Sequence, residues 1–247
     1  MTTGTGPIVP RWEWRTFGTR FGRAEVVFES LEPEGVQESD ELYFLSPGGA
    51  NVKIRNDLVD VKVLEEVDAD GLERWMPILK AEFPLTSATV RQIVDAMGIG
   101  DITLHRETFT LDELITDLAA TVQLVQVHKR RVRYSVGGCT AEVSEVTVDG
   151  RPTRTIAIES EDAAAVVDAV REVGLGSYIN TNYQKGLSWV VDGAPERYAI
   201  IDVGTNSVKF HVSEWRDGQW STTLDRAELT RLGEGLAEEG SITPDAF

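Results

Sequence analysis

Hydrophobic and polar residues alternate in many short runs of the chain, a pattern with a period of two that is typical of half-buried β-strands. Turn signals such as Asn56-Asp57 and Asp149-Gly150 separate several of these runs, as expected for hairpins. The predicted strands cover residues 11–17, 41–46, 51–57, 60–66, 73–83, 121–136, 139–148 and 151–161. About eight short strands, mostly joined by hairpins, predict an antiparallel barrel or a strongly curved sheet.

Four segments have the helical period instead. They cover residues 22–31, 86–98, 110–119 and 161–174. Thr110 and Glu113 have the spacing of a capping box at the start of the third helix. In the fourth, Val166, Val170 and Val173 recur on one apolar face. The fold class is therefore predicted to be α+β.

A different pattern follows this strand-rich part. Residues 191–196 have the composition of a linker, and the stretch "YAIIDVGTNSVKFHV" from Tyr198 to Val212 predicts a strand, a tight glycine-containing turn and a second strand. We therefore expect a first domain over residues 8–190 and the beginning of another over residues 197–247.

The overall composition is ordinary for a soluble globular protein, with 41% hydrophobic and 26% charged residues. No apolar run approaches the roughly 20 residues that a membrane-spanning helix needs, and the N-terminus has no signal-peptide pattern. The single cysteine, Cys139, excludes an intramolecular disulfide framework and suits a reducing compartment. We expect a cytoplasmic protein without a membrane partner.

The charge balance raises a question about partners. The formal net charge is -17, from 41 acidic and 24 basic residues, which argues against non-specific binding of nucleic acid. If the partner is an anionic phosphate compound, the basic residues must be concentrated in one place and the acidic residues must lie mostly elsewhere.

Many basic residues share strand faces, because side chains in a strand point to the same side at every second position. Lys53 and Arg55 form one such set, and Lys129, Arg131 and Arg133 form another. These sets have two interpretations. They are either the solvated faces of one-sided sheets with cross-strand ion pairs, or the inner face of a barrel whose bases bind phosphates and whose few carboxylates hold a divalent cation.

Residues 8–190 resemble the CYTH family, the triphosphate tunnel metalloenzymes. The family has a first strand with an E-x-E-x-K pattern, an "LRIR"-like strand, a lysine strand, an arginine-rich strand, a late E-x-E strand and a closing segment. The corresponding stretches here are "RWEWR", "NVKIR", "DVKVLEE", "HKRRVRY", "IAIESE" and "NTNYQKGL". In the first strand only Glu13 is acidic, and Arg11 and Arg15 stand in the other two places, so one metal-binding carboxylate of the family is missing.

The resemblance implies an eight-stranded antiparallel tunnel that binds phosphates with bases and Mg²⁺ or Mn²⁺ with carboxylates. The implied phosphate-binding residues are Arg15, Lys53, Arg55, Lys62, Lys129, Arg131, Arg133 and Lys185. The implied catalytic and metal-binding residues are Glu13, Glu142, Glu159 and Glu161.

The later stretch resembles the exopolyphosphatase and guanosine-pentaphosphate phosphatase group, which has the actin-like ATPase fold. Its D-x-G-[ST]-N-S and R-L-G-E-G-L motifs match the residues from Asp202 to Ser207 and from Arg231 to Leu236. The implied phosphate-loop residues are Asp202, Gly204, Thr205, Asn206, Ser207 and Arg231. Residues 197–247 would be an incomplete N-terminal piece of such a domain, and a homodimer could form through the rest of it.

Two main functions follow as hypotheses. The first is a metal-dependent phosphohydrolase of inorganic polyphosphate, tripolyphosphate or a nucleoside triphosphate, within a longer polyphosphatase fusion. The second is a non-catalytic module that captures polyphosphate and delivers it to the fused phosphatase, which the incomplete first strand favours. An adenylate cyclase, an activity of some CYTH proteins, would additionally need a nucleotide-base site that no motif in the sequence indicates.

Overall fold

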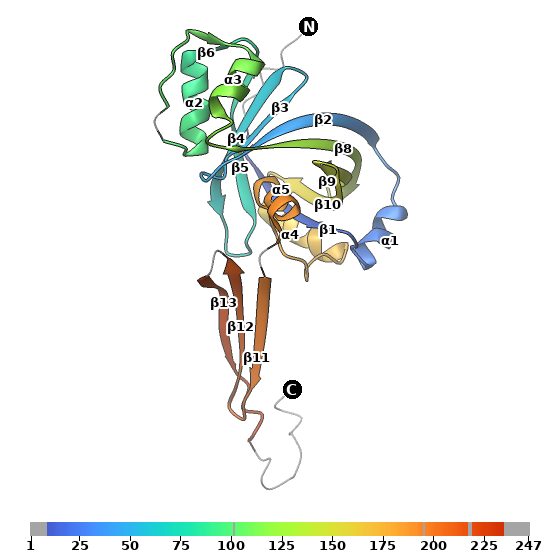
Figure 1. Ribbon diagram of the computed structural model, residues 1–247. Coiled ribbons are helices and arrows are strands. Elements are labelled where there is room, and N and C mark those ends of the chain that lie inside the picture. Colours follow the sequence, from blue (N-terminus) through green and yellow to red (C-terminus); the bar gives the residue numbers. More distant parts are fainter. Residues whose placement is uncertain (1–8, 101, 195, 217–218, 235–247) are drawn as a thin grey trace. The chain divides into compact units, whose positions relative to one another are not determined.

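The structure is a computed structural model that describes residues 9–100, 102–194, 196–216 and 219–234 (Figure 1). The chain divides into two compact units, Met1–Asp192 and Gly193–Phe247. The first unit is built around a barrel, and the second contains a three-stranded sheet.

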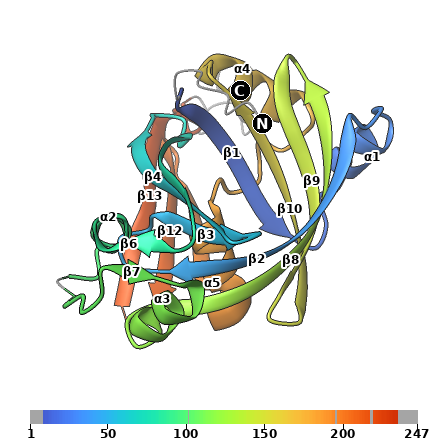
Figure 2. The ribbon, with the colours of Figure 1, turned by 90° about the horizontal axis from the view of Figure 1, so that it is seen from above.

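Eight antiparallel strands form the barrel of the first unit. They are β1 (Arg11–Gly18), β2 (Gly35–Leu45), β3 (Asn51–Arg55), β4 (Leu58–Val67), β5 (Glu73–Glu82), β8 (Gln123–Val136), β9 (Cys139–Val148) and β10 (Arg151–Ser160). Their order is β1-β10-β9-β8-β2-β3-β4-β5, and β1 closes the ring because it pairs with both β10 and β5. Figure 2 shows the barrel from above. All eight predicted strands are confirmed, and the barrel is the correct one of the two architectures.

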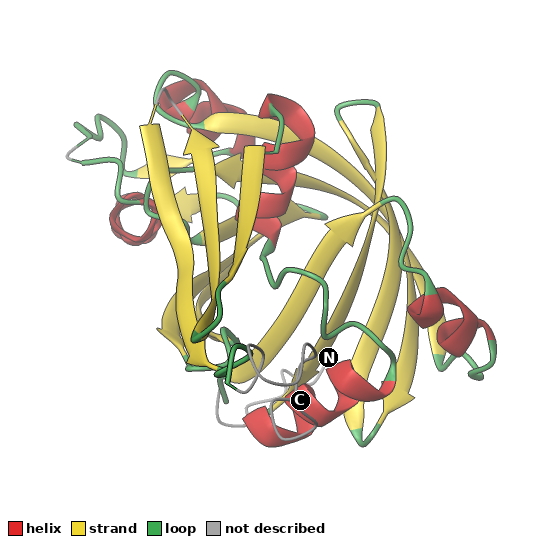
Figure 3. Cartoon of the chain, turned by 90° about the horizontal axis from the view of Figure 1, so that it is seen from below, coloured by secondary structure: helices red, strands yellow, loops and turns green. Residues whose placement is uncertain are grey.

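Five helices accompany the barrel in the part of the chain that the structure describes (Figure 3). They are α1 (Arg23–Glu29), α2 (Ser87–Met97), α3 (Leu111–Leu118), α4 (Ala163–Glu172) and α5 (Tyr183–Asp192), and a short pair of strands, β6 (Leu85–Thr86) and β7 (Thr108–Phe109), flanks α2 and α3. The predicted capping box of Thr110 and Glu113 is present at α3. Helix α5 was not predicted, and it includes the first two residues of the expected linker. None of the described helices is both long and apolar enough to span a membrane.

Apolar side chains cover the outer face of the barrel, where helices pack on them. Helix α4 packs on an outward-facing cluster that includes Trp14, Ile156 and Ile158. Helices α2 and α3 pack on another that includes Val52 and Val61. These apolar side chains point outward. Because side chains alternate along a strand, their neighbours in sequence point inward and can form a polar interior.

The inner face changes character along the barrel. On β8 the inward side chains are Val125 and Val127 at one end, followed by Lys129 and Arg131. Helix α5 packs on the apolar part of this inner face, where its residue Leu187 is buried in the same cluster as Val125 and Val127. The barrel therefore has an ionic part and an apolar part, and α5 covers the apolar part.

The second unit is a three-stranded antiparallel sheet in the order β11 (Glu196–Val203), β12 (Ser207–Arg216) and β13 (Gln219–Leu229). The predicted strand, turn and strand around residues 204–206 are confirmed. Residues 235–247, which include the last two positions of the "RLGEGL" motif, lie outside the described residues. Assignment of this unit to the actin-like fold stays a prediction.

Candidate functional site

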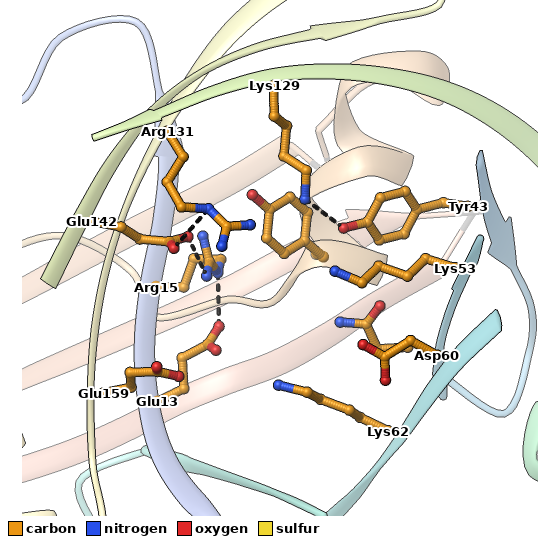
Figure 4. A pocket seen from close by; sticks show the side chains of 12 residues that line it. Glu13, Arg15, Tyr43, Lys53, Asp60, Lys62, Lys129, Arg131, Glu142 and Glu159 are labelled. Atoms are coloured by element: carbon orange, nitrogen blue, oxygen red, sulfur yellow. Dashed lines mark hydrogen bonds and ion pairs between the residues drawn. The ribbon is translucent and has the colours of Figure 1, made fainter. Parts of the chain in front are cut away.

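A polar cavity occupies the ionic part of the barrel (Figure 4). The cavity volume is about 130 Å³. It is lined by Glu13, Arg15, Tyr43, Asn51, Lys53, Asp60, Lys62, Lys129, Arg131, Glu142, Glu159 and Tyr183. The structure thus brings together eight of the twelve residues that the sequence predicts for this site.

Strand alternation places these side chains inside. Lys53 on β3 lies directly opposite Asp60 on β4, and Asp60 and Lys62 point to the same face of β4. On β8, Lys129 and Arg131 follow each other at a spacing of two residues. Of the shared faces inferred from the sequence, Lys53, Lys129 and Arg131 therefore line the lumen.

Two arginines are held in the lumen by one carboxylate. Arg15 donates from Nη2 to Glu142 Oε1 at 2.9 Å, and Arg131 Nε lies 3.1 Å from Glu142 Oε2. Arg15 also donates from Nε to Glu13 Oε1 at 2.7 Å. Ala157 stands in register between Arg15 and Glu142, and its small side chain leaves room for the guanidinium group to cross β10. Both arginines are thus fixed with donors remaining for a ligand.

The charge of Glu142 is fixed by these contacts. Burial alone would raise its pKa, but the nearby charges of Arg15 and Arg131 outweigh burial and lower the pKa to about 2. The carboxylate therefore stays ionised at every physiological pH.

Glu41 on β2 is the centre of a second ionic cluster, which the sequence analysis missed. Its fully buried carboxylate lies 2.6 Å from Lys129 Nζ and 3.5 Å from both Lys53 Nζ and Arg55 Nη1. Tyr43 donates its hydroxyl proton to the same carboxylate at 2.9 Å. Despite burial, which opposes ionisation, the pKa of Glu41 is lowered to about 2, chiefly by Lys129 and Lys53.

Lys129 is enclosed by aromatic rings. Its Nζ lies 4.3 Å from the ring centroid of Tyr183 and 5.1 Å from that of Tyr43, and it donates to the Tyr43 hydroxyl at 2.8 Å. Burial, and then the neighbouring charge of Lys53, lower the pKa of Lys129 to about 7 even though Glu41 opposes the shift. The charge of this ammonium group is therefore sensitive to pH near neutrality.

Several buried polar atoms around the cavity have no hydrogen-bond partner among the described residues. They include the hydroxyl oxygens of Tyr183 and Ser144 and the side-chain oxygen of Asn51. Burial raises the pKa of Tyr183, so its hydroxyl keeps its proton and can act as a donor. Unsatisfied buried polar atoms are costly, so this arrangement points to a polar ligand or water in the cavity.

A second hollow borders the cavity. The second hollow shares Glu13, Lys62 and Glu159 with the first and adds Val9, Arg11, Trp75 and Pro77. Arg11 is half exposed and forms a 3.1 Å ion pair with Glu159. We call this second hollow the mouth of the lumen.

The predicted site of four metal-binding carboxylates does not form. No group of three or more Asp, Glu, His or Cys side chains in the described ranges is arranged to hold a metal ion. Glu142 is bound by two arginines, and Glu161 lies in an exposed bend outside the cavity because β10 ends at Ser160. Glu13 and Glu159 remain, directly opposite each other on β1 and β10.

These two carboxylates fit a metal that is shared with a ligand. Mg²⁺ commonly takes only one or two protein carboxylates and completes its shell with water and substrate phosphates. Glu13 and Glu159 each have one oxygen in a described ion pair, with Arg15 and Arg11 respectively, and each has a second oxygen. The donor set therefore suits an ion held jointly with phosphates.

Three predicted phosphate-binding residues lie outside the cavity lining. Arg55 forms an ion pair with the buried carboxylate of Glu41, which also contacts Lys53. Arg133 continues the alternation of β8 but is exposed. Lys185 is on α5, where its Nζ lies 3.6 Å from the buried carboxylate of Glu73.

As expected, the lumen contains bases together with a few of the chain's 41 acidic residues. Its lining contains five basic and four acidic side chains, and the buried carboxylate of Glu41 lies behind the lysines. Internal ion pairs explain this mixture, because unpaired cations at this density would be strongly destabilising.

In the second unit, the two predicted phosphate-loop motifs come together. The carbonyl oxygen of Asn206 accepts hydrogen bonds from the backbone N–H groups of Thr230 and Arg231, and the Thr205 carbonyl accepts one from Gly233 at 2.7 Å. Thr205, Asn206 and Arg231 line one open hollow. The other predicted residues are beside it: Asp202 and Ser207 flank the turn on β11 and β12, and Gly204 donates its N–H to the Ser207 carbonyl at 2.9 Å.

Comparisons with known proteins give fold-level similarities only. No protein-family model and no curated protein matches the chain. A protein from Hippeastrum, studied as an adenylyl cyclase and described as having a dominant triphosphatase activity, is 12% identical, with a TM-score of 0.45 over 74% of this chain and 96% of its own. A Pyrococcus horikoshii protein is 18% identical, with a TM-score of 0.41 over 71% and 98% of the two chains.

A Bacillus halodurans protein described as an adenylate cyclase candidate is 10% identical, with a TM-score of 0.40 over 69% of this chain and 93% of its own. TM-scores below 0.5 carry no weight for the function of this chain. Membership of the CYTH family therefore stays a prediction, and the function is inferred from the residues of the lumen.

Proposed function

We propose that the barrel binds a chain of phosphates in its lumen and hydrolyses a phosphoanhydride bond with the help of Mg²⁺ or Mn²⁺. The observation that supports this most is the convergence of five cationic side chains from four strands on one cavity. They are Arg15, Lys53, Lys62, Lys129 and Arg131. Linked phosphates are the ligand class that such a density of fixed donors fits best.

The carboxylates of the lumen position these donors. Glu142 orients Arg15 and Arg131, and Glu41 orients the two lysines beside it. Guanidinium groups that are already fixed lose little conformational freedom when they bind phosphate oxygens. The buried hydroxyl of Tyr183 provides one further donor toward the cavity.

Glu13 and Glu159 are the residues that would hold a divalent ion. The chemistry that such an ion supplies when bound is polarisation of a phosphoryl oxygen and neutralisation of phosphate charge. The cations of the lumen stabilise the charge that develops on the transferred phosphoryl group, so positioning and charge stabilisation provide most of the catalysis.

A second candidate function is capture of polyphosphate without hydrolysis. It is favoured by the two arginines that already occupy the candidate metal ligands, Arg11 on Glu159 and Arg15 on Glu13. Loss of metal binding would remove hydrolysis before it removed anion binding. The loop of the second unit, with Asn206 and Arg231 side by side, would then hold phosphate in a phosphatase domain of a longer protein.

Two measurements on the full chain separate these functions. Phosphate release is followed with tripolyphosphate, long-chain polyphosphate and ATP in Mg²⁺, in Mn²⁺ and in EDTA, and binding of the same compounds is followed by calorimetry. Turnover that EDTA abolishes supports the hydrolase. Tight binding without turnover supports the capture module, and absence of both binding and turnover contradicts the proposal.

A further inference from the structure

A separate cavity of about 200 Å³ lies on the outer side of the barrel. Strand β1, helix α4, the loop between β4 and β5, and the segment between α4 and α5 surround it. Trp14 of β1 lines this cavity, whereas the next residue, Arg15, lines the lumen, so the strand separates the two. We call this cavity the outer hollow.

Hydrogen bonds within the protein fix two walls of the outer hollow. The side-chain oxygen of Asn180 accepts a bond from the backbone N–H of Arg15 at 2.7 Å, and its amide donates to the Gly71 carbonyl at 2.6 Å. In the same loop the Asp68 carboxylate accepts a bond from the backbone N–H of Leu72 at 2.8 Å. The outer hollow is therefore formed before any ligand arrives, which lowers the entropic cost of binding.

The floor of the outer hollow is apolar. Trp14, Leu72 and Val170 are each at most 5% exposed, and the half-buried Val167 and Tyr178 border them. An apolar cavity of roughly 150 Å³ is large enough to bind benzene. The outer hollow therefore has room for one six-membered ring.

The charged groups at the rim favour a cation over an anion. Asp70 is exposed, and its carboxylate has no ion-pair or hydrogen-bond partner among the described residues. The other charged group of the lining, Arg171, already lies 3.6 Å from the carboxylate of Asp168. Aromatic rings such as those of Trp14 and Tyr178 also attract cations through their negative faces.

We propose that the outer hollow is a binding site for a small organic cation, made of one apolar ring and one ammonium group. The ring packs on Trp14, Leu72 and Val170, and the ammonium group pairs with the carboxylate of Asp70. This site goes beyond the proposed function, because it shares no lining residue with the lumen or its mouth. Its test does not depend on phosphate binding.

The test uses three probes in NMR titrations of the full chain at pH 7. Phenethylamine has the ring and the ammonium group, 3-phenylpropanoate has the ring with a carboxylate, and butylamine has the ammonium group without a ring. We expect phenethylamine to bind with a dissociation constant of about 1 mM or lower, and the other two to bind at least about fivefold more weakly. Absence of phenethylamine binding, or equal or tighter binding of 3-phenylpropanoate, would overturn the proposal.

Two variants show whether the probe occupies the outer hollow. Val167→Trp fills it and should abolish phenethylamine binding, and Asp70→Asn should weaken binding about threefold. Glu172→Gln is the control for charge, because Glu172 is exposed on α4 and does not line the outer hollow. Urea denaturation establishes that each variant folds, and the exposed Asp70 position tests the site even if the bulky variant unfolds. Unchanged binding in a folded Val167→Trp protein, or equal binding to Asp70→Asn and Glu172→Gln, would contradict the proposed site.

Discussion

Glu41 Oε2 lies 2.6 Å from Lys129 Nζ, and each of the two side chains is at most 1% exposed. A buried carboxylate thus stands directly behind the lysine that faces the innermost part of the lumen. This pair directs Lys129 toward the cavity and compensates the charge of a group that burial would otherwise neutralise.

Substitution of Glu41 should destabilise the barrel. In Glu41→Gln the buried cations Lys129 and Lys53 lose their counter-charge, and we expect a loss of about 3–5 kcal/mol in the free energy of unfolding, measured by urea denaturation. Glu38→Gln on the same strand is the control, because Glu38 is exposed and its nearest cationic partner, Arg130, is 3.8 Å away. Equal stability of the two variants would disprove the role given to Glu41.

The affinity for phosphate should depend on the protonation of Lys129. Because burial lowers its pKa to about 7, the free protein loses this positive charge as the pH rises through neutrality. An arginine at this position stays charged over the same range. The ratio of wild-type to Lys129→Arg affinity for tripolyphosphate, measured from pH 6 to pH 9, should therefore fall with rising pH. A ratio that does not change with pH would show that Lys129 remains charged.

Arg131 should contribute to the affinity for tripolyphosphate, whereas its neighbour Arg130 should not. Arg131 lines the cavity and Arg130 points outward on the same strand. Arg131→Gln removes charge-assisted hydrogen bonds and should weaken tripolyphosphate binding by about 10- to 100-fold. Arg130→Gln is the matched control, with affinity close to that of the wild type in the same titration. If both variants bind normally, the lumen is not the phosphate site.

The stability of the barrel should fall in acid partly through Glu142. Its folded-state pKa of about 2 lies below the ordinary value of 4.5, so its contribution is fully present above pH 4.5 and is lost as the pH falls toward 2. Glu142→Gln should be less stable at pH 6 but should lose less stability between pH 4.5 and pH 2. The check is a series of urea titrations at each pH, and parallel curves for the two proteins would refute the assignment.

The close packing of helix α5 on strand β1 can be tested by adding one methyl group. Gly186→Ala would place a Cβ against the Phe17 ring, and we expect a loss of about 1–3 kcal/mol in the free energy of unfolding. Gly176→Ala is the control, because a Cβ there would meet no atom within 4 Å. Thermal or urea unfolding of both variants decides the matter, and an unchanged Gly186→Ala protein would mean that α5 is not tightly packed on β1.

The strands and four of the helices could be predicted from the sequence because their signals are local. The alternation of hydrophobic and polar residues indicates the strands. Three helices begin at cap residues whose side chains accept backbone hydrogen bonds, namely Thr86, Thr110 and Asp162. Helix α5 was missed because its helical face is defined by the interior of the barrel. Tyr183 and Leu187 are apolar contacts only in the presence of strands that are distant in the sequence.

Local alternation also allowed part of the candidate site to be predicted. Alternation shows which side chains share a face, so Lys53, Lys129 and Arg131 were found. It does not show where a strand leaves the lumen, and Arg133 was therefore included although it is exposed. Glu41 was missed because an acidic residue at the beginning of an apolar strand is normally exposed, and only the pairing of β2 with β8 brings it to Lys129.

The residues that complete the lumen come from distant parts of the first unit. Arg15 belongs to the first strand, whereas Tyr183, whose ring centroid lies 4.3 Å from the guanidinium carbon of Arg15, belongs to the last helix. Contacts between residues so far apart in sequence form slowly and late. A nascent chain on the ribosome can build hairpins early, but it acquires its binding chamber only after the segment around Tyr183 has emerged.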